Sequence, residues 1–316
     1  MDYICSHNIQ ARPLTRYRMY WIFVVNGRKD KGFIDQELNI QLADAGIEYE
    51  VYHTKSEGDA TRFVRIYCDF HPDDEVCFVA CGGNGTLSEV ANGVVGTRNK
   101  SLAMLAYGAT SSFSCYFPGR DFRSVKDLVA GETMKSDIIK CNNEYSINVA
   151  NFGFDSMCGY FGDLYIQEGK SKPYLRGTLR ALLFNRVNNF RIIVDGKRMS
   201  RGLTMMCAVA NSKYYGEFYK CAPNAVIDDG YFDVVVARFC PLIVFLLLFN
   251  KFKNGTYVDS KLARLVFKFR KARHIEASSK DLIYLCVDGE TTASRYFDIE
   301  LLDKAVTLRI PALKTK

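Results

Sequence analysis

The sequence lacks any apolar run long enough to cross a lipid bilayer. Its longest run, PLIVFLLLF, covers only residues 241–249, whereas a membrane-spanning helix needs about 20 residues. The first residues, MDYICSHNIQARPLTRYR, also lack the apolar core that a secretory signal peptide requires. We therefore expect a cytoplasmic protein.

Histidine is scarce, and the cysteines do not form metal-binding pairs. The chain has 4 histidines and 11 cysteines, and no two cysteines have the CxxC spacing. Cys77 and Cys81 are the closest pair, but they flank the apolar residues FVA, which is typical of a buried strand. We expect no zinc site, and we expect free thiols, as in a reducing compartment.

Charge of one sign is not in large excess. Lysine and arginine exceed aspartate and glutamate by 42 − 35 = 7, which suits an anionic partner such as a nucleotide or a membrane surface. Such a mild excess, without a recognition motif, does not predict nucleic-acid binding. With 316 residues, 48% of them hydrophobic and 24% charged, the chain predicts two globular domains.

The first 110 residues alternate between apolar and amphipathic segments. Strands are expected at MYWIFVVN (19–26), IEYEVYHT (47–54), EVCFVACGG (75–83) and SLAMLAYG (101–108), and a helix over 34–45. Strands separated by helices predict right-handed crossovers and a parallel sheet, whose ligands lie beyond the carboxyl ends of the strands. The ends expected to meet at one crevice are 26–32, 54–59, 82–86 and 108–112.

The second half of the chain has a different pattern. Strand-like runs are broken by NN, DG and DDG signals, which favour hairpins and a mainly antiparallel β domain. Helices are expected over 175–187 and 241–252. We place the first domain at 1–133 and the second at 134–297.

The segment CGGNGTLSEV (81–90) places three glycines between a buried strand and a helix. Glycine lets the backbone approach a ligand closely, and the first N–H groups of a helix suit a phosphate. The segment matches neither GxGxxG nor GxxxxGK[ST], so a tight turn without a ligand is the alternative. Arg28, Lys29 and Lys31, at the end of the first strand, could add positive charge.

Carboxylates gather at two turns in the second half. The DGE segment at 288–290 could provide a general base and its orienting partner, although Asp-Gly is also a common hairpin turn. The segment PNAVIDDGYFD (223–233) clusters carboxylates and carbonyls that suit Mg²⁺. A plain turn between strands is the alternative there.

Positive charge follows the apolar run. An apolar helix next to basic residues predicts peripheral contact with an anionic membrane through residues 241–273, and a core helix is the alternative. The basic residues are Lys251, Lys253, Lys261, Arg264, Lys268, Arg270, Lys271 and Arg273.

Several motifs occur together in a characteristic order over nearly the whole chain. They are the Asn26 loop, Thr54 with Gly58-Asp59-Ala60, GGNGTLSEVANG (82–93), Asp137, NVANFGFDS (148–156), Ala210-Asn211 with Tyr215-Gly216, APNAVIDDGYFDV (222–234) and VDGE (287–290). In this order and spacing the chain resembles the catalytic family of soluble bacterial diacylglycerol kinases, sphingosine kinases and ceramide kinases.

The resemblance implies a Rossmann-like α/β domain of the NAD kinase and diacylglycerol kinase type, followed by an antiparallel β-sandwich. The last strands, within 298–316, would return to the first domain, as LLDKAVTLRIP (301–311) suggests. The implied reaction is phosphoryl transfer from ATP, with Mg²⁺, to a hydroxyl of a diacylglycerol- or sphingoid-like lipid. A homodimer is also plausible from the family.

The resemblance also implies roles for individual residues. Glu290 would be the catalytic base with Asp288 beside it, and Asp137 would belong to the phosphate network. A structural Mg²⁺ would be held by Val226, Asp229 and Tyr231. The implied nucleotide-binding residues are Asn26, Gly27, Arg28, Lys29, Asp30, Thr54, Gly82, Gly83, Asn84, Gly85, Thr86, Leu87, Ser88, Gly108 and Ala109.

The chain departs from the family pattern at two acids. Asn84 replaces the aspartate of GGDGT, and AYGATSS (106–112) replaces PxGTxND, so that Ser112 stands where an aspartate is expected. Neutral side chains recruit Mg²⁺ less well than carboxylates do. Three hypotheses follow: an active lipid kinase, a pseudokinase that binds nucleotide or lipid as a regulator or carrier, and a kinase of a soluble substrate such as NAD. The lipid-branch motifs NVANFGFDS and DDGYFDV disfavour the third.

Overall fold

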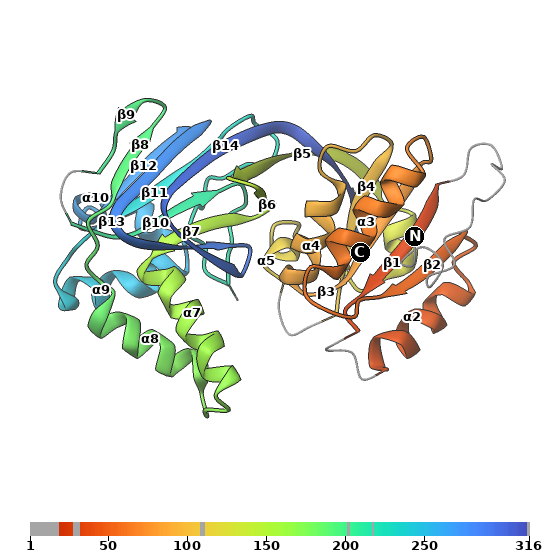
Figure 1. Ribbon diagram of the computed structural model, residues 1–316, viewed down its shortest axis with the longest axis horizontal. Helices are drawn as coiled ribbons and strands as arrows, with labels where there is room; N and C mark the ends of the chain where they lie inside the picture. The colour runs from red at the N-terminus through yellow and green to blue at the C-terminus, as the bar shows by residue number, and fades with distance from the viewer. Residues whose placement is uncertain (1–18, 28–31, 108–110, 201–202, 217, 315–316) are drawn as a thin grey trace.

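The protein is described by a computed structural model over residues 19–27, 32–107, 111–200, 203–216 and 218–314. Figure 1 shows two lobes, joined by the long strand β14 (Glu290–Ile310). The N-terminal lobe contains β1 (Tyr20–Val25), β2 (Tyr49–His53), β3 (Val76–Gly82), β4 (Lys100–Ala106), α2 (Phe33–Ala43), α3 (Asp59–Phe70), α4 (Asn84–Val94), α5 (Ser112–Cys115) and α6 (Val125–Val129).

The sheet of the N-terminal lobe is parallel, as the sequence predicts. β1 pairs in parallel with both β2 and β3, and β3 pairs in parallel with β4. The uninterrupted apolar runs of β1 and β3 are buried, which is typical of central strands with helices on both faces. All four expected strands and the expected helix are therefore present, with ends shifted by one or two residues.

The C-terminal lobe is mainly antiparallel, and the predicted fold class is confirmed. Its strands are β5 (Glu132–Cys141), β6 (Glu144–Ser146), β7 (Val149–Gly153), β8 (Arg191–Val194), β9 (Lys197–Arg198), β10 (Thr204–Ala210), β11 (Phe232–Arg238), β12 (Phe267–Ala272) and β13 (His274–Val287). Its helices are α7 (Phe154–Gln167), α8 (Pro173–Phe184), α9 (Leu242–Lys253), the 3₁₀ turn η1 (Thr256–Asp259) and α10 (Ala263–Val266).

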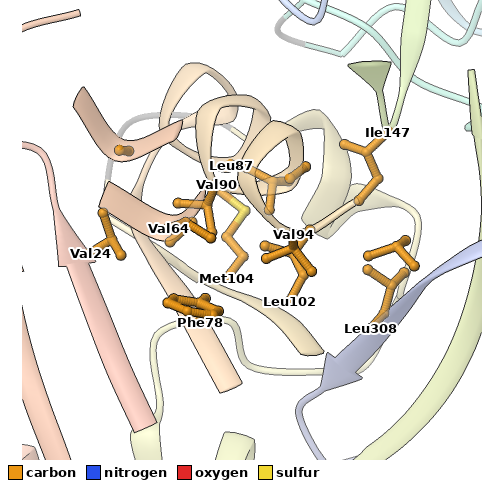
Figure 2. Close-up of a cluster of buried hydrophobic side chains, with 14 of the residues drawn as sticks. Val24, Val64, Phe78, Leu87, Val90, Val94, Leu102, Met104, Ile147 and Leu308 are labelled. Carbon is orange, nitrogen blue, oxygen red and sulfur yellow. The ribbon is translucent and has the colours of Figure 1, made fainter. Parts of the chain in front are cut away.

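Strand β14 connects the two lobes. Its first half pairs antiparallel with β13, and near its end Leu308 lies opposite Leu102 of β4 in a parallel pair. The predicted return of the last strands to the first domain is therefore present. Figure 2 shows Leu308 and Ile147 in the same buried cluster as Phe78 and Leu102. Because these residues come from both halves of the chain, the lobes share this core.

Helix α7 was not among the helices expected from the sequence, where residues 137–154 form a strand-like run. β7 ends at Gly153, whose φ of 108° favours glycine. A Cβ at this position would lie 2.5 Å from the carbonyl oxygen of Met205. The Ser156 hydroxyl accepts a hydrogen bond from the Gly153 N–H at 3.1 Å and so starts the helix.

Two expectations about the whole chain concern thiols and membrane spans. The ten cysteines within the described ranges are all free. Across these same ranges, every helix is too short or too polar to span a membrane.

Candidate active site

The carboxyl ends of β1 and β2 meet the start of α4. The Asn26 side-chain amide donates a hydrogen bond to the Thr86 hydroxyl at 3.4 Å, and the Gly27 N–H donates to the Thr54 hydroxyl at 3.3 Å. A Cβ on Gly27 would lie 2.6 Å from the Thr54 carbonyl oxygen, so the close approach requires glycine. The predicted convergence of these strand ends is confirmed.

The glycine loop joins β3 to α4. Gly83 precedes the helix, and no side chain caps it. A Cβ on Gly83 would meet no atom within 4 Å, whereas one on Gly82 would lie 2.5 Å from the Thr86 hydroxyl oxygen. Gly82 is therefore needed for packing, and Gly83 leaves open space before the first helical N–H groups. This geometry fits an anionic group such as phosphate.

Other residues of the implied nucleotide site differ in accessibility. Leu87 is fully buried and packs in the core, so it could contribute only through its backbone. The Ser88 side chain is also buried. Five further predicted residues, Arg28, Lys29, Asp30, Gly108 and Ala109, lie outside the described residues.

Asn84 faces the start of α5. The Ser111 hydroxyl lies 3.3 Å from Oδ1 of Asn84 and also accepts a hydrogen bond from the Ser114 N–H. Ser112, at the other position where the resemblance expects an acid, is buried. The two positions therefore hold an amide and a hydroxyl in place of the acids that the resemblance expects.

Glu290, the first residue of β14, reaches the glycine loop from the C-terminal lobe. A Cβ on Gly85 would lie 3.7 Å from Oε1 of Glu290. Burial raises the pKa of the Glu290 carboxyl, and the nearby carboxylates of Glu57, Glu89 and Asp163 raise it further. A carboxyl with a raised pKa beside an anion site is suited to proton transfer.

The sequence did not single out these three neighbouring carboxylates. Glu57 and Glu89 lie within two of the motifs already noted, next to Gly58 and in GGNGTLSE, so their position was available. Asp163 lies on α7, where it accepts a hydrogen bond from the Tyr174 hydroxyl at 3.0 Å. Because α7 was not expected, no sequence signal indicated its proximity.

Asp288 is buried, and its carboxylate binds backbone. Oδ2 accepts a hydrogen bond from the Ile147 N–H at 2.7 Å, and Oδ1 accepts from the N–H groups of Asn148 at 3.1 Å and Val149 at 3.0 Å. Asp288 adopts the left-handed conformation, with a φ of 48°, in the turn that leads to Glu290. Asp288 therefore fixes this turn to the start of β7 and positions the glutamate.

Asp137 is fully buried at the junction of the lobes. Its two oxygens accept N–H donors from Gly230 at 2.8 Å and Lys304 at 2.7 Å. Both oxygens thus hold backbone, which is a structural role; the predicted role in a phosphate network stays a prediction.

The implied metal-binding turn contains Val226, Asp229 and Tyr231. One Asp229 oxygen accepts the Tyr231 N–H at 3.1 Å, and the other forms an ion pair with Lys271. Within the described ranges, no three histidine, cysteine, aspartate or glutamate side chains are grouped as a metal site.

Comparison with known proteins places the chain in a family. The family described as "Diacylglycerol kinase catalytic domain" matches residues 20–141, and "YegS C-terminal NAD kinase beta sandwich-like domain" matches residues 148–310. Diacylglycerol kinases from Staphylococcus aureus strains bovine RF122 / ET3-1 and JH9 are each 28% identical over 256 residues, which cover 79% of this chain and 78% of theirs.

Solved structures show the same fold. Two crystal structures from Bacillus anthracis str. Sterne, the first of "a putative diacylglycerol kinase" and the second of a diacylglycerol kinase, superpose with TM-scores of 0.73 and 0.68 at 22% and 21% identity. Each match covers 94% of this chain and 98% of the other. The two domain matches, which together span most of the sequence, show that the chain is a kinase that belongs to the diacylglycerol kinase-like family of lipid kinases.

Proposed function

We propose that the protein transfers the γ-phosphoryl group of ATP, with Mg²⁺, to a hydroxyl of a diacylglycerol- or sphingoid-like lipid, and that Glu290 is the base. The position of Glu290 against Gly85 carries the proposal, because it puts a proton acceptor from one lobe beside the anion site of the other. The relatives named diacylglycerol kinases support the choice of a lipid hydroxyl.

The chain's own groups have distinct roles in this proposal. The open N–H groups after Gly83 would bind the phosphates, with Asn26 and Thr54 beside them. ATP would supply the phosphoryl group, and Mg²⁺ would accompany the phosphates of ATP. Because the side chain of Asn84 is uncharged, it would be a weaker metal ligand than a carboxylate.

Glu290 must be ionised to accept the proton of the lipid hydroxyl. Burial and the surrounding carboxylates raise its pKa, which makes its ionised form a stronger base once formed. When the Glu290 carboxylate accepts the proton it becomes neutral, so the transfer would remove one negative charge from a cluster of carboxylates. Positioning and proton transfer are thus combined in one side chain.

The test is transfer of labelled γ-phosphate from ATP to diacylglycerol, sphingosine, ceramide and phosphatidylglycerol, with and without Mg²⁺. Glu290→Gln should lower turnover by about 10²-fold or more, because general-base catalysis contributes typically 10²–10⁴-fold. ATP affinity, measured by calorimetry, should be nearly unchanged. Glu276→Gln, on the neighbouring strand β13, is the matched control. Equal activity of Glu290→Gln and the control would refute the assignment of Glu290.

We propose further that α8 and α9 contact an anionic membrane. Most apolar side chains of α9 are exposed, and only Leu248 and Phe252 are buried, so the alternative of a core helix is not favoured. Figure 1 shows α8 and α9 at the same end of the C-terminal lobe, and both contribute to one core cluster. The exposed leucine, isoleucine and phenylalanine residues of the two helices, hereafter the apolar face, are Leu175, Leu179, Leu183, Phe184, Leu242, Ile243, Leu246, Leu247 and Phe249.

The charge near the apolar face suits an anionic surface. Lys251 and Lys253 lie in the last turn of α9, and Lys261 and Arg264 follow it and are exposed. An exposed apolar surface rimmed by basic side chains is typical of interfacial helices. A lipid kinase needs such a contact, because its substrate is held in the bilayer.

Vesicle sedimentation tests this contact. Binding should rise with the phosphatidylglycerol content of phosphatidylcholine vesicles and fall with salt. The double variant Ile243→Ser/Leu247→Ser should bind at least about tenfold more weakly, because each exposed aliphatic side chain contributes roughly 1.5–3 kcal/mol when buried. Ile40→Ser on α2 removes an isoleucine that is also exposed, but on the other lobe, and should have no effect. Unchanged binding of the double variant would exclude the apolar face.

Asn84 favours a second candidate function, a regulator or carrier that binds nucleotide or lipid without transferring phosphate. In this case wild-type protein would bind ATP but label no lipid. Asn84→Asp combined with Ser112→Asp should then restore Mg²⁺-dependent transfer. Labelled lipid with wild-type protein would reject this candidate.

A further inference from the structure

The turn at residues 226–231 docks the C-terminal lobe onto the N-terminal lobe. Ile227 is buried in the core of the N-terminal lobe. Its carbonyl oxygen accepts the Asp137 N–H at 2.7 Å, and its own N–H donates to the Tyr116 hydroxyl at 3.3 Å. The Gly230 N–H in turn donates to Asp137. The conformation of this turn therefore affects how the two lobes meet.

Two partly buried carboxylates at the turn need a positive partner. Asp229 lies within it, and Asp233 follows on β11. Both side chains are largely buried, with exposed fractions of 27% and 17%. Oδ2 of Asp233 accepts no hydrogen bond from the described residues. Two such carboxylates close together repel each other and are costly to desolvate unless a cation neutralises them.

The cation that lies near both carboxylates is Lys271. Strand β12 pairs antiparallel with β11 so that Lys271 lies directly opposite Asp233. Its ammonium forms an ion pair with Asp229 and lies 3.9 Å from Oδ2 of Asp233. The register of two strands thus delivers one positive charge between the two carboxylates.

A magnesium ion does not fit this arrangement. Mg²⁺ requires near-octahedral oxygen ligands at about 2.0–2.1 Å, but one oxygen of Asp229 accepts the Tyr231 N–H and the other forms an ion pair with Lys271. An ion bound to Asp229 would also face the lysine's positive charge at close range. The one carboxylate in the predicted ligand set of Val226, Asp229 and Tyr231 is therefore paired with a cation of the chain itself.

We propose that the Lys271 ammonium takes the place of the structural magnesium ion implied at the 226–231 turn, so that this chain holds the junction of its lobes without a bound metal. The proposal is independent of the kinase reaction, because it concerns only the charge balance of the turn. Any Mg²⁺ that accompanies ATP at the glycine loop is a separate ion.

Thermal unfolding without nucleotide tests the proposal. The midpoint of the wild-type protein should be the same after treatment with EDTA and in 10 mM MgCl₂. Lys271→Met leaves Asp229 and Asp233 without their cation, so its midpoint should fall by about 2 °C or more. Mg²⁺ should then raise that midpoint in a saturable manner.

Two controls make the result specific. Lys268→Met removes the same charge from β12 at a residue that instead donates to the Met199 carbonyl, and its midpoint should not respond to Mg²⁺. Lys271→Met/Asp229→Asn removes both partners of the ion pair; it should be more stable than Lys271→Met and should not respond to Mg²⁺ either.

Three outcomes would overturn the proposal. One is a wild-type midpoint that EDTA lowers and Mg²⁺ restores. The second is a Lys271→Met protein as stable as wild type, and the third is a destabilised Lys271→Met protein that Mg²⁺ leaves unchanged. If Lys271→Met fails to fold, Mn²⁺ binding to the wild-type protein is measured by electron paramagnetic resonance. A tightly bound Mn²⁺ ion that is lost in Asp229→Asn would contradict the proposal. The absence of such an ion would support the proposal.

Discussion

Replacing Asp288 by asparagine should destabilise the protein as well as reduce its activity. The buried Asp288 carboxylate accepts N–H donors from three consecutive residues, 147–149, and hydrogen bonds to a charged group contribute roughly 1.5–3 kcal/mol each. Asparagine keeps one accepting oxygen but turns an NH₂ group toward the remaining donors. At least one buried N–H therefore loses its partner, and we expect the free energy of unfolding to fall by roughly 2–4 kcal/mol.

The assay is urea unfolding of wild type and variant, followed by circular dichroism, with phosphoryl transfer measured on the same preparations. Turnover should fall as well, because the turn that carries Glu290 is no longer fixed to the start of β7. Asp281→Asn is the matched control, since Asp281 is an exposed carboxylate on β13; such surface changes usually stay within about 0.5 kcal/mol.

The decisive comparison is between stability and activity. If Asp288→Asn unfolds at the urea concentration of wild type while its turnover is lost, Asp288 acts in the chemistry and not as a clamp on the backbone. A joint loss of both, with Asp281→Asn unchanged, is the result expected from the geometry.

Two further predictions concern pH. Glu57→Gln removes a neighbouring carboxylate that raises the pKa of Glu290, so the acid limb of the kcat profile should move to lower pH; an unmoved limb contradicts this. Burial raises the pKa of Asp155 from 3.8 to about 7. The free energy of unfolding of the wild-type protein should therefore fall as the pH rises from about 4 to 7. Asp155→Asn lacks this titrating group, so its stability relative to wild type should be greater at pH 8 than at pH 5 by roughly 2–3 kcal/mol. Melting midpoints at the two pH values test this, and an equal difference between variant and wild type at both would refute the prediction.

Periodicity and composition predicted much of the fold. The apolar runs at β1 and β3 predicted buried strands, and the glycines after β3 predicted the loop that joins this strand to α4. Helices α8 and α9 were also expected, close to their observed bounds. These features depend on neighbours within a few residues, which is the range over which a sequence pattern is informative.

Features that depend on distant partners were not predictable from the sequence. The DGE turn could not reveal that Asp288 binds residues 147–149, because these are about 140 positions away in the chain. The same holds for the ion pair between Asp229 and Lys271, which follows from the register of β11 and β12. Helix α7 was missed because its start continues an apolar strand, and only the backbone at Gly153 separates the two.

The neutral residues at positions 84 and 112 and the cation at position 271 act on different parts of the molecule. At the glycine loop, the proposed phosphate contacts come from backbone N–H groups and the proposed base is Glu290, so neither of these two proposed roles uses the side chain at position 84. What Asn84 weakens is the attraction for a divalent ion. At the 226–231 turn, Lys271 supplies a positive charge from the chain itself. The proposed replacement of a metal at the turn and the proposed weakening of the metal site at the loop are therefore separable, and only the second would affect the rate of the proposed transfer.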